Sequence, residues 1–208
     1  MTPDELRQRW AERSGEFSPD YYAHYGPDET SEAIRRHIER TVDSESEPSI
    51  LELGCSSGRH LAHLHDNGYR NLHGIDVNEE AMTVMRQAYP ELAAAGTFYI
   101  DAIESVVSAF DDDAFDVVYS VETLQHIHPD NEWVFDELAR VAADCLLTVE
   151  IEGDADAETP EVNYVDDAVP LYHRRWSRIF SARGFTETAS ERLDNDTLRL
   201  FRRSADVR

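Results

Sequence analysis

The segment Ile50-Leu51-Glu52-Leu53-Gly54-Cys55-Ser56-Ser57-Gly58-Arg59-His60-Leu61 decides the fold of this chain. It combines a short apolar run, a turn with two glycines and the start of a helical pattern. Gly54 and Gly58 allow the backbone to turn sharply and to approach a ligand without a Cβ in the way, and the N–H groups of a helix start are free donors. The segment therefore predicts a buried strand that leads into a nucleoside-binding turn.

Short apolar runs alternate with helical patterns after this turn, which is typical of βα units in a parallel sheet. The expected strands are 50–53, 71–75, 97–100, 116–119 and 145–149, and the expected helices are 59–67, 79–88, 103–110 and 132–142. The acidic stretch 150–167 is predicted to be a loop with a turn at Thr159-Pro160. A helix over 171–183 and closing strands at 186–188 and 197–201 are expected after it.

The residues before the first strand favour a helical cap. Thr2-Pro3-Asp4-Glu5 has a capping residue, a proline at the first helical position and a glutamate three residues after the cap, which predicts a helix to about residue 14. An aromatic turn is expected over 17–27 and a second helix over 28–42. We expect a single domain over 1–208, with a cap at 1–48, a cofactor-binding core at 49–149 and a closing part at 150–208.

The composition restricts where the protein resides and what state its thiols are in. The chain starts with a charged segment rather than a basic and then apolar one, and no apolar run approaches the roughly 20 residues of a membrane span. We therefore expect a cytoplasmic protein. Cys55 and Cys145 lie in separate apolar segments, so that reduced thiols are expected for both.

The charge of the chain is strongly one-sided. Its formal net charge is -24, and it contains no lysine at all. Such a surface repels itself at low salt, so we interpret the chain as salt-adapted, in other words halophilic. The acidity argues against a nucleic-acid substrate, which needs a basic surface. The missing lysine excludes the usual forms of P-loop, pyridoxal and protein-kinase chemistry.

Polar groups follow two further predicted strands. The second strand ends at Asp76, about 20 residues after the glycine turn, where a carboxylate can accept hydrogen bonds from both ribose hydroxyls. The third ends at Asp101-Ala102. Because open α/β sheets bind ligands at the carboxyl ends of their strands, these groups are expected at one edge together with the glycine turn.

Taken in order and at this spacing, the motifs resemble those of the class I S-adenosylmethionine-dependent methyltransferases, especially the small-molecule methyltransferase-domain type. The resemblance covers roughly residues 49–149. The matching segments are Glu52-Leu-Gly54-Cys-Ser-Ser-Gly58, Gly74-Ile-Asp76-Val-Asn78, Tyr99-Ile-Asp101-Ala102, the stretch Phe115 to Asp130 and Glu137-Leu-Ala-Arg140-Val. The resemblance implies a Rossmann-like, doubly wound, seven-stranded and mostly parallel sheet with an antiparallel last strand.

The same resemblance implies S-adenosyl-L-methionine as cofactor and S-adenosyl-L-homocysteine as product. The residues it assigns to the cofactor are Glu52, Gly54, Cys55 and Gly58 around the methionine part, Asp76 at the ribose, Val77, Asp101 and Ala102 at the adenine, and Ser120 near the amino group. Two positions depart from the family pattern. Ser56 replaces the middle glycine of the first motif, and Ala142-Ala143-Asp144 replaces a Pro-Gly-Gly turn.

The acceptor side is less defined by sequence. An acceptor hydroxyl would need a base, and His126 is the first candidate because it follows the fourth strand and an unperturbed histidine pKa of about 6.5 suits proton transfer. The alternative, that His126 only shapes the pocket, stays open. In the layout of the resembled family, the helices before the first strand often cover the cofactor, which implies that Tyr22 or Tyr25 lines the acceptor pocket. The alternative, that these tyrosines form a small satellite core, stays open. The pairs His126/His128 and His63/His65 are interpreted as packing or surface residues rather than metal ligands.

Two other functions compete with methyl transfer. An NAD-dependent oxidoreductase also uses a glycine turn followed by an acid, although the Gly54-to-Gly58 spacing departs from that fingerprint. A protein that binds the cofactor without catalysis is the other alternative. A small-molecule acceptor is favoured on charge grounds. The sequence leaves open its identity, the methylated atom and the oligomeric state.

Overall fold

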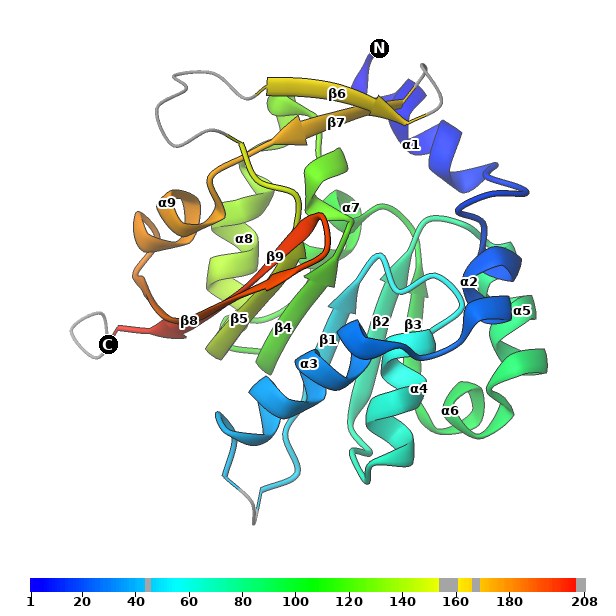
Figure 1. The fold of residues 1–208 in the computed structure, drawn as a ribbon, viewed down its shortest axis with the longest axis horizontal. Coiled ribbons are helices and arrows are strands. Elements are labelled where there is room, and N and C mark those ends of the chain that lie inside the picture. Colours follow the sequence, from blue (N-terminus) through cyan, green and yellow to red (C-terminus); the bar gives the residue numbers. More distant parts are fainter. Residues whose placement is uncertain (44–45, 154–160, 166–168, 205–208) are drawn as a thin grey trace.

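The computed structural model describes residues 1–43, 46–153, 161–165 and 169–204. Its centre is a seven-stranded sheet with the strand order β3-β2-β1-β4-β5-β9-β8 (Figure 1). The strands are β1 (Ile50–Leu53), β2 (Leu72–Asp76), β3 (Thr97–Ile100), β4 (Phe115–Val121), β5 (Ala142–Glu150), β8 (Phe185–Leu193) and β9 (Asp196–Arg203). The first five pair in parallel, and β9 is antiparallel to both neighbours. The predicted sheet with a reversed last strand is confirmed.

Helices cover both faces of this sheet and the edge at its strand ends. They are α1 (Pro3–Ala11), α2 (Pro19–Tyr25), α3 (Glu29–Glu39), α4 (Arg59–Asp66), α5 (Glu80–Ala88), α6 (Pro90–Ala95), α7 (Ile103–Val107), α8 (Val134–Val141) and α9 (Trp176–Ser181). Apolar residues of α7, α8 and α9 form one core with one face of the sheet, and those of α3 to α6 form a second core with the other face. Leu51 and Leu53 join the first core and Ile50 the second, as alternation along a strand requires.

The N-terminal segment forms the predicted cap. The side chain of Thr2 accepts a hydrogen bond from the N–H of Glu5, whose carboxylate accepts one from the N–H of Thr2, so the capping box is present. Leu6 on α1 packs against the hairpin of β6 (Glu161–Val165) and β7 (Val169–His173) through Val169 and Tyr172. Figure 1 shows α1 and this hairpin together above the strand ends. The cap therefore covers the edge at which the site was expected.

Three local predictions are wrong. The aromatic stretch 17–27 contains a helix, α2, which starts at Pro19 with Ser18 as its cap. The expected helix over 171–183 is the strand β7 followed by the short helix α9. The acidic stretch 150–167 contains β6, which pairs with β7. The expected turn at Thr159-Pro160 lies outside the described residues.

Helix α6 was not predicted, and the structure extends most strands by one or more residues. Both cysteines, Cys55 and Cys145, are buried free thiols. In the described part of the chain, no helix is both long and apolar enough to cross a membrane.

Candidate active site

A cavity of about 370 Å³ opens at the carboxyl ends of the central strands. The end of β1 contributes Glu52 and Gly54, the end of β2 contributes Asp76, and the residue after β3 is Asp101. Val121 at the end of β4 completes this wall. The cavity thus lies where open α/β sheets bind their ligands.

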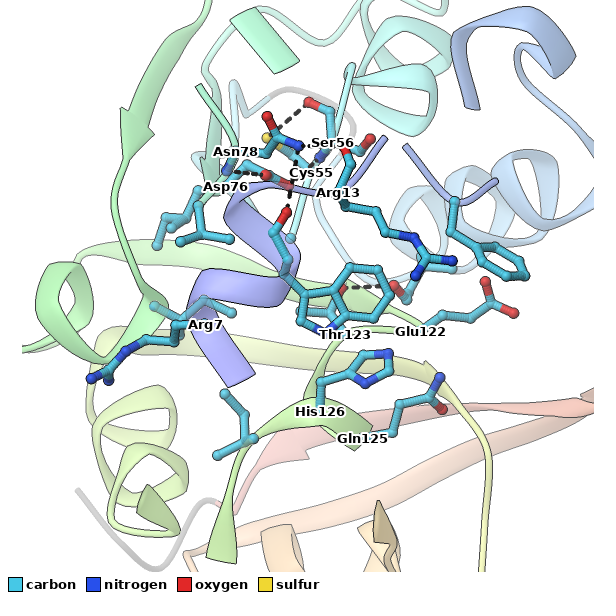
Figure 2. Close-up of a pocket in the computed structure, with 18 of the residues that line it drawn as sticks. Arg7, Arg13, Cys55, Ser56, Asp76, Asn78, Glu122, Thr123, Gln125 and His126 are labelled. Atoms are coloured by element: carbon cyan, nitrogen blue, oxygen red, sulfur yellow. Dashed lines mark hydrogen bonds between the residues drawn. The ribbon is translucent and has the colours of Figure 1, made fainter. Parts of the chain in front are cut away.

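Most of the residues predicted for the cofactor lie together in this cavity. Those that line it are Glu52, Gly54, Cys55, Asp76, Val77, Asp101 and Ala102. Figure 2 shows Asp76, Ser56 and Asn78 at one end of the cavity and His126 with Gln125 at the other. We call these the cofactor end and the acceptor end.

Asp76 joins two turns at the cofactor end. Its Oδ2 accepts a hydrogen bond of 2.7 Å from the N–H of Ser56, in the glycine turn, and its Oδ1 accepts one of 2.8 Å from the N–H of Asn78. Burial raises the pKa of this carboxyl, and the backbone donors act against the rise. A carboxylate has about four lone-pair sites, so oxygen positions remain for ligand hydroxyls.

Glu52 brings an unpaired acceptor to the same end. The residue is 1% exposed, and its carboxyl interacts with the buried hydroxyl of Tyr119, while Oε2 makes no close hydrogen bond among the described residues. Burial raises the pKa of the carboxyl well above its usual range. A buried polar atom without a partner costs free energy, which a ligand that supplies a donor or a positive charge would recover.

Asp101 and Ala102 form a small turn after β3. The N–H of Ala102 donates to Oδ1 of Asp101 over 2.6 Å, while Asp101 itself is exposed. Val77, the residue after β2, also lines the cavity. The three residues therefore form one wall that fits a flat ring with polar edges.

Three predicted site residues lie outside the cavity lining. Gly58 caps α4 in a left-handed conformation (φ +82°), and a Cβ there would meet Met85 and Leu92, so its role is in packing. Ser120 is fully buried, and its hydroxyl donates to Glu150 rather than toward the cavity. Tyr25 ends α2 and is 64% exposed.

Tyr22, the other predicted tyrosine, does line the cavity. Arg59 at the start of α4 lies over its ring at 4.9 Å, and burial raises the pKa of its hydroxyl. The hydroxyl therefore stays protonated at neutral pH and can act as a hydrogen-bond donor.

Helix α1 closes the acceptor end with residues that the sequence analysis did not single out as site residues. Trp10 lines the cavity, and its ring lies 4.5 Å from that of His126. The side chain of Asn78 donates to the carbonyls of Trp10 (3.4 Å) and Arg13 (3.2 Å), which ties the end of α1 to the end of β2. The sequence carries one signal for this position, because the four-residue spacing of Leu6 and Trp10 places both on one face of the predicted helix.

His126 faces this end as a neutral side chain. Its Nδ1 lies 3.3 Å from the carbonyl oxygen of Pro170. Because a carbonyl oxygen can only accept, Nδ1 carries the proton and Nε2 keeps a lone pair. Burial lowers the pKa of the imidazole to about 4, so the ring is uncharged at neutral pH.

Two carboxyl groups near the acceptor end were also missed by sequence reasoning. Glu122 and Asp196 line the cavity, Glu122 directly after β4 and Asp196 at the start of β9. The two side chains are hydrogen-bonded to each other, and burial together with Glu122 raises the pKa of Asp196 well above its usual range. Asp196 could not be placed beside Glu122 from the sequence, because β9 reaches β5 only through long-range pairing.

The histidine pairs have partners other than metals. His63 contacts Glu32 over 3.0 Å, and Nδ1 of His128 accepts from the N–H of Asp130. Within the described residues, the structure contains no group of three or more His, Cys, Asp or Glu side chains arranged to hold a metal ion.

Known proteins share this sequence pattern and this fold. Residues 50–144 match the family model described as "Methyltransferase domain". Over these residues, a little under half of the chain, the sequence is similar to a methyltransferase domain. The matched methyltransferase domain holds β1 to β4, α4 to α8 and the start of β5, together with the glycine turn and the carboxylates at the cofactor end.

Curated relatives and solved structures agree with this match. The O-methyltransferase cnsE of Penicillium expansum is 26% identical over 111 residues, which are 51% of this chain and 40% of that protein. The mitochondrial ubiquinone biosynthesis O-methyltransferase of Saccharomyces cerevisiae is 27% identical over 123 residues, 56% of this chain and 36% of that protein. The chain therefore spans less than half the length of these relatives.

An S-adenosylmethionine dependent methyltransferase from Mesorhizobium loti has the same fold. It superposes with a TM-score of 0.62 at 15% identity, covering 89% of this chain and all (100%) of that one. At this identity the likeness concerns the fold alone.

Proposed function

We propose that this protein transfers a methyl group from S-adenosylmethionine to a small-molecule acceptor. The observation that carries the proposal is that one cavity contains both the predicted cofactor residues and a separate set of side chains around His126. An enzyme of this class needs its two substrates in contact, because much of the acceleration in such a displacement comes from alignment of the reacting atoms.

The cofactor end suits the proposed cofactor group by group. Asp76 would accept hydrogen bonds from the ribose hydroxyls, and Oε2 of Glu52 would accept one from the amino group of the methionine part. Val77 and Ala102 pack on the adenine. When bound, S-adenosylmethionine supplies an electrophilic methyl group on a positively charged sulfur.

The acceptor end suits a neutral or basic molecule better than an acidic one. Glu122 and Asp196 line it as a hydrogen-bonded pair in which Asp196, with its pKa raised to about 8, keeps a proton at neutral pH, and Arg13 also lines the cavity. The excess of negative charge is that of the whole chain, whose net charge is -24. His126 stays neutral and presents Nε2 as a hydrogen-bond acceptor for the hydroxyl or amine that is methylated. Both curated relatives above are named O-methyltransferases, which favours an oxygen nucleophile.

The cofactor is tested first, by calorimetric titration with S-adenosylhomocysteine in molar potassium chloride. Wild type is expected to bind with a micromolar Kd, and Asp76→Ala is expected to lose this binding. Asp116→Ala is the matched control, since Asp116 also accepts a backbone N–H, from Ser49 over 2.7 Å, but lies outside the cavity lining. No binding by folded wild type would refute the proposal and reopen NAD as a ligand.

The transfer itself is tested with S-adenosylmethionine that carries a tritiated methyl group. Panels of phenols, aliphatic alcohols, amines and carboxylic acids are offered as acceptors, and transfer of label to a neutral or basic molecule is expected. Tight cofactor binding without transfer to any panel member would instead favour the binding-only function. Transfer to carboxylic acids alone would contradict the argument from charge.

A further inference from the structure

The segment between β4 and α8 carries the residues of the acceptor end on a single turn. This turn is the 3-10 helix η1 (Leu124–His126), with Glu122 and Thr123 before it. A turn this short cannot satisfy its own terminal N–H and carbonyl groups, so other residues must. Two buried charged side chains do so, one at each end.

Glu150, the last residue of β5, accepts hydrogen bonds from the N–H groups at the start of the turn. It is fully buried (0% exposed). Its Oε1 accepts from the N–H of Thr123 (3.1 Å) and of Leu124 (3.0 Å), and its Oε2 accepts from the N–H of Gln125 (3.1 Å). The hydroxyl of Ser120 adds a fourth hydrogen bond, at 2.8 Å.

Arg174, the residue after β7, donates hydrogen bonds to the carbonyl groups at the other end of the turn. It is 3% exposed, and its guanidinium donates to the carbonyl of Ile127 over 2.7 Å and to that of Leu124 over 3.4 Å. A third hydrogen bond, of 3.1 Å, reaches Glu132, and the guanidinium lies over the rings of Tyr172 and Phe135. The partly positive N–H end of the turn thus contacts the buried carboxyl of Glu150, and the partly negative carbonyl end contacts the buried guanidinium of Arg174.

Neither Glu150 nor Arg174 lines the cavity, so neither can contact the acceptor. Together they make five hydrogen bonds with the backbone of 123–127, of which Glu150 accepts three and Arg174 donates two. Burying two charged groups costs several kcal/mol unless they are well paired. The turn they hold is the one that places Gln125 and His126 in the cavity.

We propose that Glu150 and Arg174 are positioning residues, which hold the η1 turn so that the imidazole of His126 stays buried against Trp10 and Pro170 at the acceptor end. Pro170 and Arg174 come from the same strand region, so that the carbonyl that orients the ring and the guanidinium that anchors its backbone move together. The catalytic role of this turn rests on the proposed function. The burial of His126 by the turn can be measured without any ligand.

The group whose environment reports on this turn is His126 itself. The ring contacts Trp10 of α1 and Pro170 of β7, and Arg13 after α1 is the charged group that acts on it. Burial and the charge of Arg13 lower its pKa, and the Pro170 carbonyl raises it. A turn that is released at its carbonyl end would expose the ring to water and move this pKa back toward its ordinary value.

The test compares Arg174→Met with Arg140→Met in the full chain. Arg140 is a matched control because its guanidinium also donates to two backbone carbonyls, those of Val107 and Phe110, and to carboxylates, while none of these residues lines the cavity. The measurement is the pH titration of the His126 imidazole signals by NMR, together with the Kd for S-adenosylhomocysteine.

Arg174→Met is expected to raise the His126 pKa by about one unit or more, while Arg140→Met leaves it unchanged. The Kd for S-adenosylhomocysteine is expected to stay within about threefold, because the cofactor end is anchored through Asp76 rather than through η1. An unchanged His126 pKa in folded Arg174→Met would overturn the inference. Failure of wild type to bind S-adenosylhomocysteine would instead count against the proposed function.

Arg174→Lys keeps the experiment decisive if the methionine variant does not fold. A lysine keeps the charge and can reach one carbonyl, but it cannot form the guanidinium fork. We expect a smaller rise in the His126 pKa than for Arg174→Met, in the same direction. A folded Arg174→Lys protein with the wild-type His126 pKa would also contradict a positioning role.

Discussion

The rings of Trp10 and His126 lie 4.5 Å apart with their planes inclined by 58°, although the two residues are more than 100 positions apart in the sequence. Trp10 comes from the first helix and His126 from the turn after β4. Their contact makes α1 a wall of the cavity rather than a peripheral appendage. The stability of the cap should therefore affect ligand binding.

The link between α1 and the cofactor end is the side chain of Asn78, which gives the first prediction. Asn78→Ala removes its two hydrogen bonds to the carbonyls of Trp10 and Arg13. Two hydrogen bonds of this kind contribute about 1–2 kcal/mol, so the Kd for S-adenosylhomocysteine should rise by about 5- to 30-fold. Stopped-flow fluorescence should show that faster release accounts for most of this change.

The matched control for this variant is Asn67→Ala. Asn67 also donates its side-chain amide to a backbone carbonyl, that of His63 at the end of α4, but it is exposed and outside the cavity lining. Equal effects of the two substitutions would mean that the tie between α1 and β2 has no special role in binding.

Gly54 allows the close approach of two loops, which gives the second prediction. It has φ +68°, and a Cβ there would overlap the side chain of Thr123. Gly54→Ala should therefore abolish S-adenosylhomocysteine binding and lower the free energy of unfolding by more than the roughly 1 kcal/mol that a positive φ alone costs a side chain. Urea unfolding and calorimetry measure the two effects.

Gly68→Ala separates strain from overlap, because Gly68 has φ +97° and nothing within 4 Å of the added Cβ. It should lose only the strain energy and keep full binding. The double variant Gly54→Ala/Thr123→Ala should recover part of the lost stability. If the Gly68 and Gly54 substitutions cost the same, steric overlap at Gly54 is not the cause.

Much of this fold could be predicted because its signals are local. The strand at Ile50–Leu53, the glycine turn and the capping box at Thr2 each depend on residues within a few positions of one another. The cofactor end follows, since parallel strands in a known order bring Asp76 and Asp101 to one edge.

The acceptor end could not be predicted in the same way. The helix predicted over 171–183 is wrong for Leu171–His173, because the strand conformation of these residues depends on pairing with 161–165. Trp10 and Asp196 reach the cavity only because α1 and β9 pack at its edge. Such placement depends on tertiary contacts, which no local pattern encodes.

Glu150 gives a prediction for the pH dependence of stability. Burial raises its folded-state pKa to about 7, from an ordinary value of 4.5. The folded state therefore holds a proton that the unfolded state releases between these values, so this group stabilises the fold fully below pH 4.5 and loses that contribution as the pH rises through about 7. The total loss is about 3 kcal/mol.

Urea unfolding between pH 5 and pH 8, run on wild type and on Glu150→Gln, isolates this contribution. The variant cannot titrate at this position, so the wild-type minus variant difference in unfolding free energy should fall across this range. A difference that is constant with pH would show that Glu150 has an ordinary pKa in the folded protein.

The charge of the chain gives a prediction for salt. A net charge of -24 repels itself strongly at low ionic strength. Raising potassium chloride from about 0.1 M to about 1 M shortens the Debye length from about 10 Å to about 3 Å, so the melting temperature should rise steadily over this range. Sodium chloride at equal ionic strength should give the same rise if screening is the cause. A flat or falling melting temperature would contradict the interpretation of salt adaptation.

The role of His126 gives the last prediction, for the acceptor that the methylation screen returns. A group with a pKa of about 4 is a weak base, but its neutral ring can orient a hydroxyl or amine through Nε2. His126→Gln preserves a hydrogen-bond acceptor there, so kcat should fall by less than about tenfold while KM rises, since positioning supplies the acceleration. On this account wild-type kcat shows no histidine inflection between pH 6 and pH 8. A fall in kcat of a hundredfold or more, typical of a lost general base, together with a wild-type inflection near pH 6.5, would assign proton transfer to His126 instead.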